Sequence, residues 1–159
     1  KRRDFGTRYL LVKGARHAFW RGLSYISPMA SVFTKIIRGE LPSYKVYEDD
    51  HVLAFLSIDP INPGHTLIVP KLEIDHFTDV PEPYWTAVHK AAQPIGRAIR
   101  EATGCRRVGL AVQGFEVPHF HLHLIPLNSP SDFSFHNARR LPDAEMKSVQ
   151  AAIIGKLKF

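Results

Sequence analysis

Apolar and polar residues alternate most regularly between Val117 and Pro126. Successive side chains of a β-strand point to opposite faces, so a strand here would separate the two kinds of residue. One face would carry the three histidines, His119, His121 and His123. The other face would carry three large apolar residues, Phe120, Leu122 and Leu124. In an α-helix, residues two apart differ by about 200° and the histidines would scatter. The alternation therefore predicts a strand whose apolar side joins the core.

The patterning before this segment predicts a short helix and three strands. Ser31 is a suitable N-cap for a helix over residues 32–38, and Gly39 is a suitable stop. Residues 45–48 and 51–58 read as two strands joined by a tight turn, which makes a hairpin. After a loop rich in Pro, Asn and Gly, residues 65–70 read as a third strand. Its first residue, His65, suits either a surface position at a strand end or a functional site.

The remaining pattern predicts one long helix, a strand pair and a final helix. An apolar stripe runs through about twenty residues after Pro83 and ends at Gly104, and Pro94 should kink this helix. Residues 108–113 read as a strand joined by a short turn to the histidine strand. A final amphipathic helix is expected over residues 143–157. The predicted fold is α+β, with about five mostly antiparallel strands, one long helix and terminal helices.

Charge separates the N-terminus from the rest of the chain. Residues 1–28 carry seven Lys and Arg residues but one acid, while the rest of the chain holds 14 basic and 14 acidic residues. The net charge of +6 therefore belongs to a basic arm or leader, residues 1–30. A leader before Met29 is the simplest interpretation, and a mitochondrial targeting segment or an arm for nucleic acid or anionic membrane remain alternatives. Residues 31–127 would form the main domain and residues 128–159 a C-terminal extension with a helix.

Length and composition exclude several classes of protein. A chain of 159 residues can bury one sizeable core, and its 45% hydrophobic content is ordinary for a globular protein. The one cysteine, Cys105, leaves no internal disulfide and no cysteine-pair zinc site. No apolar run approaches the roughly 20 residues that span a bilayer. We expect a cytoplasmic protein, or a mitochondrial one if the arm is a targeting segment. We do not expect nucleic-acid or membrane binding, because the domain body is neutral.

Three histidines on one strand face suit three kinds of role. Two triad histidines that lie two residues apart could hold zinc together with His65 or with the third histidine of the triad. Three ligands on one strand, however, would spread over about 13 Å. Alternatively, a neutral imidazole is a good nucleophile near pH 7 and can attack phosphorus. The middle ring, His121, would then have a donor on either side. The third possibility is that the histidines only decorate a solvent-exposed face.

These segments together resemble the histidine triad (HIT) family, whose signature is His-x-His-x-His followed by apolar positions. Residues 33–42 resemble the family's opening, and Tyr47-Glu48-Asp49-Asp50 with Leu53-Ala54-Phe55 resembles its first hairpin. Residues 62–70 resemble the segment that supplies a fourth histidine. The resemblance covers about 95 residues, 32–127, in the family's order, and the chain looks like a bacterial branch.

The resemblance implies a HIT-like fold and a hydrolase or transferase acting at the α-phosphorus of purine nucleotide–X substrates. His121 would be the nucleophile and would form a nucleotidyl-histidine intermediate. His119 and His123 would contact the phosphate oxygens, with His119 also protonating the leaving group. His65 would hydrogen-bond the other ring nitrogen of the nucleophile, directly or through its neighbour. The positions implied for nucleotide binding are Val32, Phe33, Ile36, Phe55, Ser57, Ile58, Gln113 and Val117.

Two departures from the family pattern affect the expected substrate. Ser57 stands where the family commonly has Asp or Asn for the ribose hydroxyls, and Glu116-Val117-Pro118 stands where many members have Gln-Ser or Gln-Thr. The resemblance also implies a homodimer and no required cofactor or metal. The expected activity is that of a nucleoside phosphoramidase or a dinucleoside polyphosphate hydrolase. A nucleotide-binding or scaffold protein with little turnover, and a zinc-binding protein, are the alternatives.

Overall fold

A computed structural model describes residues 30–159 of the chain, so the predicted basic arm lies almost wholly outside the described residues. Its strands form one five-stranded antiparallel sheet in the order β1-β2-β3-β5-β4. The strands are β1 (Lys45–Glu48), β2 (Val52–Leu56), β3 (Thr66–Pro70), β4 (Arg107–Ala111) and β5 (Leu122–Leu127). The α-helices are α1 (Val32–Ile37), α2 (Tyr84–Thr103) and α3 (Asp143–Lys156). Short 3-10 helices are η1 (Phe77–Asp79), η2 (Pro130–Asp132) and η3 (Phe135–Asn137). The predicted α+β class is confirmed.

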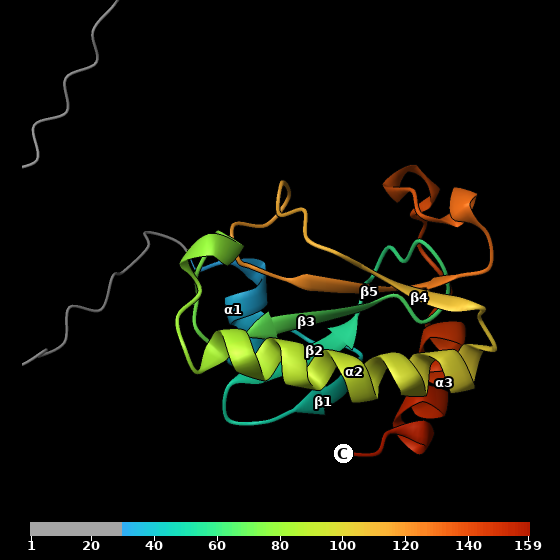
Figure 1. The fold of residues 1–159 in the computed structure, drawn as a ribbon, viewed down its shortest axis with the longest axis horizontal. Helices are drawn as coiled ribbons and strands as arrows, with labels where there is room; N and C mark the ends of the chain where they lie inside the picture. The colour runs from blue at the N-terminus through green and yellow to red at the C-terminus, as the bar shows by residue number, and fades with distance from the viewer. Residues whose placement is uncertain (1–29) are drawn as a thin grey trace, which may run out of the picture.

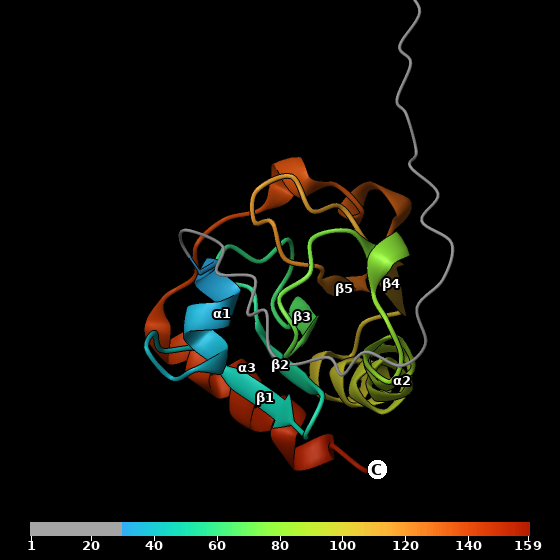
Figure 2. The same cartoon turned by 90° about the vertical axis from the view of Figure 1, so that its left-hand side faces the viewer.

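The two faces of the sheet pack against different helices, because side chains alternate along each buried strand. In β2, Val52, Ala54 and Leu56 join a core formed with α2 and α3. Leu53 and Phe55 point the other way and join a smaller apolar cluster with Phe33 of α1. Figures 1 and 2 show α2 and α3 below the sheet, with α1, the β4–β5 connection and the η2–η3 segment on the opposite side. This second side carries the histidines.

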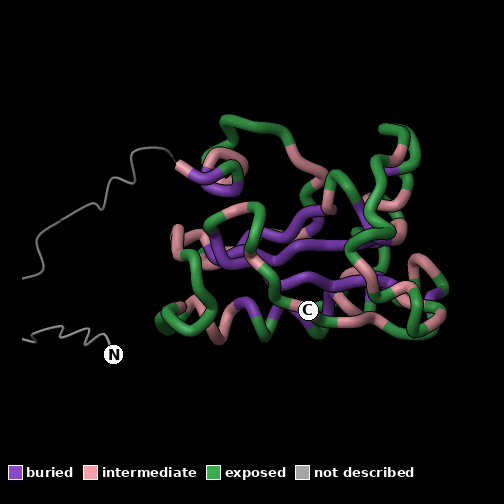
Figure 3. The backbone as a smooth tube through the Cα atoms, turned by 90° about the horizontal axis from the view of Figure 1, so that it is seen from above, coloured by how far each residue is buried: buried purple, intermediate pink, exposed green. Residues whose placement is uncertain are grey.

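Burial is concentrated in the central strands, whereas the connections between elements are exposed (Figure 3). The C-terminal segment contributes to the same core, since Met146 and Ile153 of α3 are buried within it. None of the helices among residues 30–159 is long and apolar enough to cross a membrane. The predicted bounds of most elements lie within one or two residues of the observed ones.

The histidine segment departs from the prediction of a continuous strand. Ala111, the last residue of β4, is paired with His123, so residues 112–121 have no partner in β4 and form a long connection instead of a short turn. Strand β5 begins at Leu122, and only His123 of the three histidines lies in it. The alternation of sides nevertheless holds, because Phe120, Leu122 and Leu124 all enter the core beneath the sheet.

Candidate active site

A hydrogen-bonded pair of histidines crosses from the loop before β3 to β5. The His65 Nδ1 atom accepts the Ile61 main-chain N–H at 3.2 Å, so its proton is on Nε2. That Nε2–H donates to Nδ1 of His123 at 2.9 Å. His123 must therefore carry its own proton on Nε2, and this buried nitrogen has no hydrogen-bond partner among the described residues. The pair thus ends in an unpartnered N–H donor.

The neighbouring ring, His121, has the opposite arrangement. Its Nδ1–H donates to the main-chain carbonyl of His119 at 2.7 Å, which leaves the lone pair on Nε2. No hydrogen bond within residues 30–159 occupies this Nε2 atom. The centroids of the His121 and His123 rings are 4.8 Å apart. A free acceptor and a free donor nitrogen therefore stand on adjacent rings.

Burial keeps these rings neutral. It lowers the pKa of His121, although the bond to the His119 carbonyl and the charge of Glu116 act in the other direction. Burial also lowers the pKa of His65 to about 4, with repulsion from His121 adding to the effect. For His123, burial and then repulsion from His65 and His121 lower the pKa to about 3. At neutral pH the His121 lone pair is consequently available for attack.

The role predicted for His119 is wrong in one respect: its ring is not free to contact a phosphate or protonate a leaving group. The residue is fully buried, Nε2–H donates to the Pro70 carbonyl at 2.9 Å, and Nδ1 lies 3.0 Å from Ser31 Oγ. Because the chain is not yet in a strand here, the ring turns toward α1 and the end of β3. His119 supports the nucleophile through its main-chain carbonyl.

Of the two routes predicted from His65 to the nucleophile, the structure lacks the direct hydrogen bond and connects His65 to the neighbour, His123. The His119 carbonyl already occupies Nδ1 of His121, so a direct bond from His65 is absent. His65 bonds to His123 instead, and His123 is the neighbour that touches the His121 ring edge-on.

Four of the apolar residues predicted for nucleotide binding are brought together. Phe33 and Phe55 are buried in the smaller cluster, and Ile36 and Val117 pack against it. The Phe33 ring meets the His121 ring edge-on, with centroids 5.0 Å apart. An apolar surface therefore adjoins the nucleophile on the α1 side.

The other four predicted positions are not part of this cluster. Val32 is 42% exposed on α1, Gln113 is exposed in the β4–β5 connection, and Ser57 is half-buried after β2. Ile58 is 57% exposed and lines a cavity of about 690 Å³ with Tyr44 and residues of α3.

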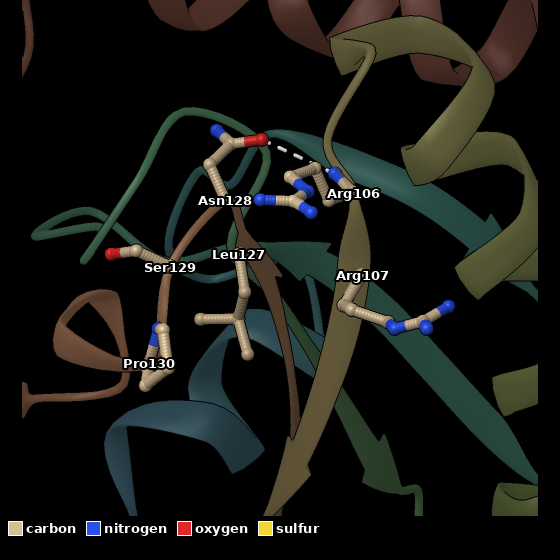
Figure 4. Close-up of a pocket in the computed structure, with 6 residues that line it drawn as sticks. All are labelled: Arg106, Arg107, Leu127, Asn128, Ser129 and Pro130. Carbon is tan, nitrogen blue, oxygen red and sulfur yellow. Dashed lines mark hydrogen bonds between the residues drawn. The ribbon is translucent and has the colours of Figure 1, made fainter.

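A second cavity, of about 620 Å³, lies where β4 begins and β5 ends (Figure 4). Its lining residues are Arg106, Arg107, Leu127, Asn128, Ser129 and Pro130, and none of them is a histidine. The main-chain N–H of Arg106 donates to Asn128 Oδ1, and the side chain of Arg107 points away from that pair.

Sequence patterns did not reveal two further neighbours of the histidines. Phe135 of η3 meets the His123 ring edge-on at 5.0 Å and lies 6.5 Å from the His65 ring. Glu73 bonds to Ser31 and Thr34 beside His119. Neither residue belongs to a periodic segment or to a motif, so no local signal marks it. Among residues 30–159, no group of three or more His, Cys, Asp or Glu side chains is arranged to hold a metal ion.

The antiparallel sheet and the hydrogen-bonded histidines beside it define the histidine triad class of α+β proteins. A family model described as the HIT domain matches residues 38–129. The protein called Protein hit of Bacillus subtilis is 43% identical over 112 residues, which cover 64% of this chain and 73% of that protein. Adenosine 5'-monophosphoramidase HNT1 of Saccharomyces cerevisiae is 36% identical over 98 residues, 61% of this chain and 62% of that protein.

Solved structures agree with these matches. The crystal structure of a Hit-like protein involved in cell-cycle regulation from Bartonella henselae, with an unknown ligand, superimposes with a TM-score of 0.74 at 31% identity. It covers 80% of this chain and 96% of the Bartonella chain. The chain belongs to the HIT family, as its sequence motifs indicated, and bacterial proteins are among its relatives.

Proposed function

We propose that this protein is a nucleotide phosphoramidase or nucleotidyl hydrolase that acts at the α-phosphorus of purine nucleotide–X substrates. The supporting observation is the pair of free nitrogens on adjacent rings, a lone pair on His121 Nε2 and an unpartnered N–H on His123 Nε2. A buried donor without a partner is costly, and a phosphate oxygen would satisfy it. The relative named adenosine 5'-monophosphoramidase gives the same substrate class for that protein.

The reaction would proceed in two displacements. The His121 Nε2 lone pair attacks the α-phosphorus, a nitrogen–phosphorus bond forms, and the bond to X breaks with its electron pair leaving on X. The N–H of His123 balances charge on a phosphate oxygen. Solvent protonates X, since both ring nitrogens of His119 are engaged. Water then attacks the phosphorus and loses a proton to solvent, and the nitrogen–phosphorus bond breaks with its electron pair returning to His121 Nε2, which releases the nucleoside monophosphate. This scheme requires no cofactor or metal.

A turnover screen with a nucleophile variant tests the proposal. Wild type should hydrolyse one or more of a set of adenosine and guanosine phosphoramidates and dinucleoside polyphosphates, and mass spectrometry of quenched reactions should find a nucleotide on His121. His121→Ala should lose turnover, while His76→Ala, which changes an exposed histidine, should keep it. Nucleotide binding with no turnover by wild type would instead favour a binding or scaffold protein. Stoichiometric zinc in protein purified without an affinity tag would favour a zinc protein.

We further propose that the protein forms a homodimer through the edge of the sheet at β4. Among residues 30–159 this strand has one neighbour, so within that part of the chain its other edge presents unpaired main-chain groups. Leu110, in β4, and Val112, just beyond it, are 57% and 45% exposed. Leu110→Glu should convert the dimer to a monomer in light scattering. A wild-type monomer at micromolar concentration would contradict this proposal.

A further inference from the structure

A carboxylate from the segment after β3 binds the beginning of α1. Glu73 Oε2 accepts the main-chain N–H of Ser31 at 3.2 Å and also accepts the Thr34 hydroxyl. Burial acts to raise the pKa of Glu73, but these bonds and the nearby His119 and Arg38 lower it overall. Glu73 is therefore an ionised acceptor that holds two groups of α1 at once.

Ser31, which is the N-cap of α1, and Thr34 of α1 also reach the buried ring of His119. Because Nε2 of that ring donates to Pro70, Nδ1 must accept a hydrogen bond. The Thr34 hydroxyl proton is committed to Glu73, whereas the single Ser31 hydroxyl proton has two acceptors in reach, Thr34 Oγ1 at 3.1 Å and His119 Nδ1 at 3.0 Å. We assign it to Nδ1, because this buried nitrogen has no other donor. Ser31 Oγ in turn accepts the Thr34 main-chain N–H at 3.1 Å, which caps α1. Every polar group in this chain of contacts has a partner.

The chain of contacts ends at the nucleophile. The main-chain carbonyl of His119 accepts the Nδ1–H of His121 and so places the lone pair on Nε2. Helix α1 also carries Phe33, whose ring meets the rings of both His119 and His121 edge-on. Ser31, Thr34, His119 and His121 are each at most 8% exposed, so a displacement of one is transmitted to the next by contact.

We propose that Glu73 is a positioning residue for His121, acting through Ser31, Thr34 and His119. It holds the Ser31 main-chain N–H and the Thr34 hydroxyl, so that the Ser31 hydroxyl donates to the His119 ring and the His119 carbonyl stays against the nucleophile. This inference rests on the proposed function for its kinetic consequence, but the hydrogen-bond network can be tested without turnover. It assigns a role in the reaction to a residue that touches neither the substrate nor the reacting ring.

The chain contains a matched control for this carboxylate. Glu82 accepts the main-chain N–H and the hydroxyl of Thr86 at 3.2 and 2.8 Å, the same kinds of donor that Glu73 accepts. This contact lies at the start of α2 and is exposed. Glu82→Leu therefore reproduces the loss of such a pair of bonds without affecting the histidines.

Kinetics of three variants test the proposal. Glu73→Leu removes the acceptor and should lower kcat on an adenosine phosphoramidate about tenfold, with KM within about twofold of wild type. Glu73→Gln keeps an amide oxygen that can accept both bonds and should hold kcat within about threefold of wild type. Glu82→Leu should leave both constants unchanged. Equal constants for Glu73→Leu and Glu82→Leu would overturn the proposal.

A double-mutant cycle separates positioning from a loss of folding. Ser31→Ala breaks the link to His119 while Glu73 stays intact, and it should lower kcat as Glu73→Leu does. The double variant should be no slower than the slower single variant, because both changes break one chain of contacts. Losses that multiply would show independent roles and would overturn the proposal.

Nitrogen-15 spectra of the histidine rings decide the matter even if wild type has no turnover. In wild type, His119 should show one tautomer, protonated at Nε2, with a hydrogen-bonded Nδ1. In Glu73→Leu the His119 Nδ1 resonance should move toward that of an imidazole nitrogen without a donor, and the His121 resonances should broaden through tautomer exchange. Glu82→Leu should match wild type. Resonances of His119 and His121 that are unchanged in Glu73→Leu would refute the network, whereas absent turnover with shifted resonances would refute only the enzyme assignment.

Discussion

Phe135 meets His123 edge-on, with ring centroids 5.0 Å apart and planes at 81°. This contact joins η3, in the C-terminal segment, to the strand that carries the unpartnered donor. The aromatic ring excludes water from one side of the His65–His123 pair, and burial is the main reason that the pKa of His123 is about 3. An aromatic residue from outside the family match therefore shapes the electrostatics of the site.

Phe135→Ala should raise the pKa of His123 toward the ordinary value, because water would reach the ring and stabilise its charged form. Proton NMR titration of the histidine C2–H resonances measures the change. Phe115→Ala, which removes an 88% exposed ring from the β4–β5 connection, should leave this pKa where it is. A His123 titration that is the same in all three proteins would show that Phe135 does not shield the ring.

His65→Ala should weaken both folding and turnover. The change leaves the Ile61 N–H without its acceptor and His123 Nδ1 without its donor, which should cost about 2 kcal/mol in urea unfolding. Without a defined tautomer on His123, kcat should fall roughly tenfold. Adding His65→Ala to His123→Ala should lower kcat no further than His123→Ala alone, since the two rings act as a pair. A further multiplicative loss would mean that His65 acts by another route.

The free energy of unfolding should fall as the pH is lowered from about 6.5 to about 5. The pKa values of His65 and His123 are depressed to about 4 and about 3 in the folded protein. The unfolded chain therefore binds more protons than the native state in this window, and protonation favours unfolding. The loss should be about 2 kcal/mol per histidine at pH 5. Urea unfolding at a series of pH values measures it.

Gly64→Ala should destabilise the protein by about 2 kcal/mol. Gly64 has a φ of 95°, a conformation that L residues rarely adopt, and an added Cβ would lie 2.9 Å from Thr103 Cγ2. The strain falls directly before His65, so turnover should also decrease. Gly96→Ala is the control. Gly96 lies inside α2, and its added Cβ would make only an ordinary contact, at 4.0 Å, with Val108. The free energy of unfolding of that variant should be about 0.5–1 kcal/mol higher than that of wild type, as measured by urea unfolding.

The sheet could be predicted because its strands alternate or are continuously apolar and end at turn residues. The bounds of β1 were predicted correctly, and those of β2, β3 and β4 lie within two residues of the prediction. The histidine segment was harder, because an alternating pattern shows which side a residue faces but not whether a partner strand is present. The pairing of Ala111 with His123 leaves residues 112–121 outside the sheet, and no single stretch of sequence contains that information.

The same limit applies to the roles of the histidines. Sequence spacing singles out the middle histidine, His121, but treats His119 and His123 as equivalent, and only the contacts distinguish these two. His119 is occupied by Ser31 and Pro70, which lie 88 and 49 residues away in the chain. Phe33 and Phe55, which the family resemblance singled out, lie in one buried cluster, and the Phe33 ring meets the His121 ring. Their role in nucleotide binding stays a prediction.

The packing of α3 bears on how the chain can be shortened or recombined. The HIT-domain match ends at residue 129, but Met146 and Ile153 fill the core beneath the sheet, and Phe135 covers two of the histidines. A chain that ends at the family boundary would expose apolar core surface and, at the same time, expose the His65–His123 pair to water. Exchanging this tail for that of a relative would accordingly alter solubility and proton affinity together.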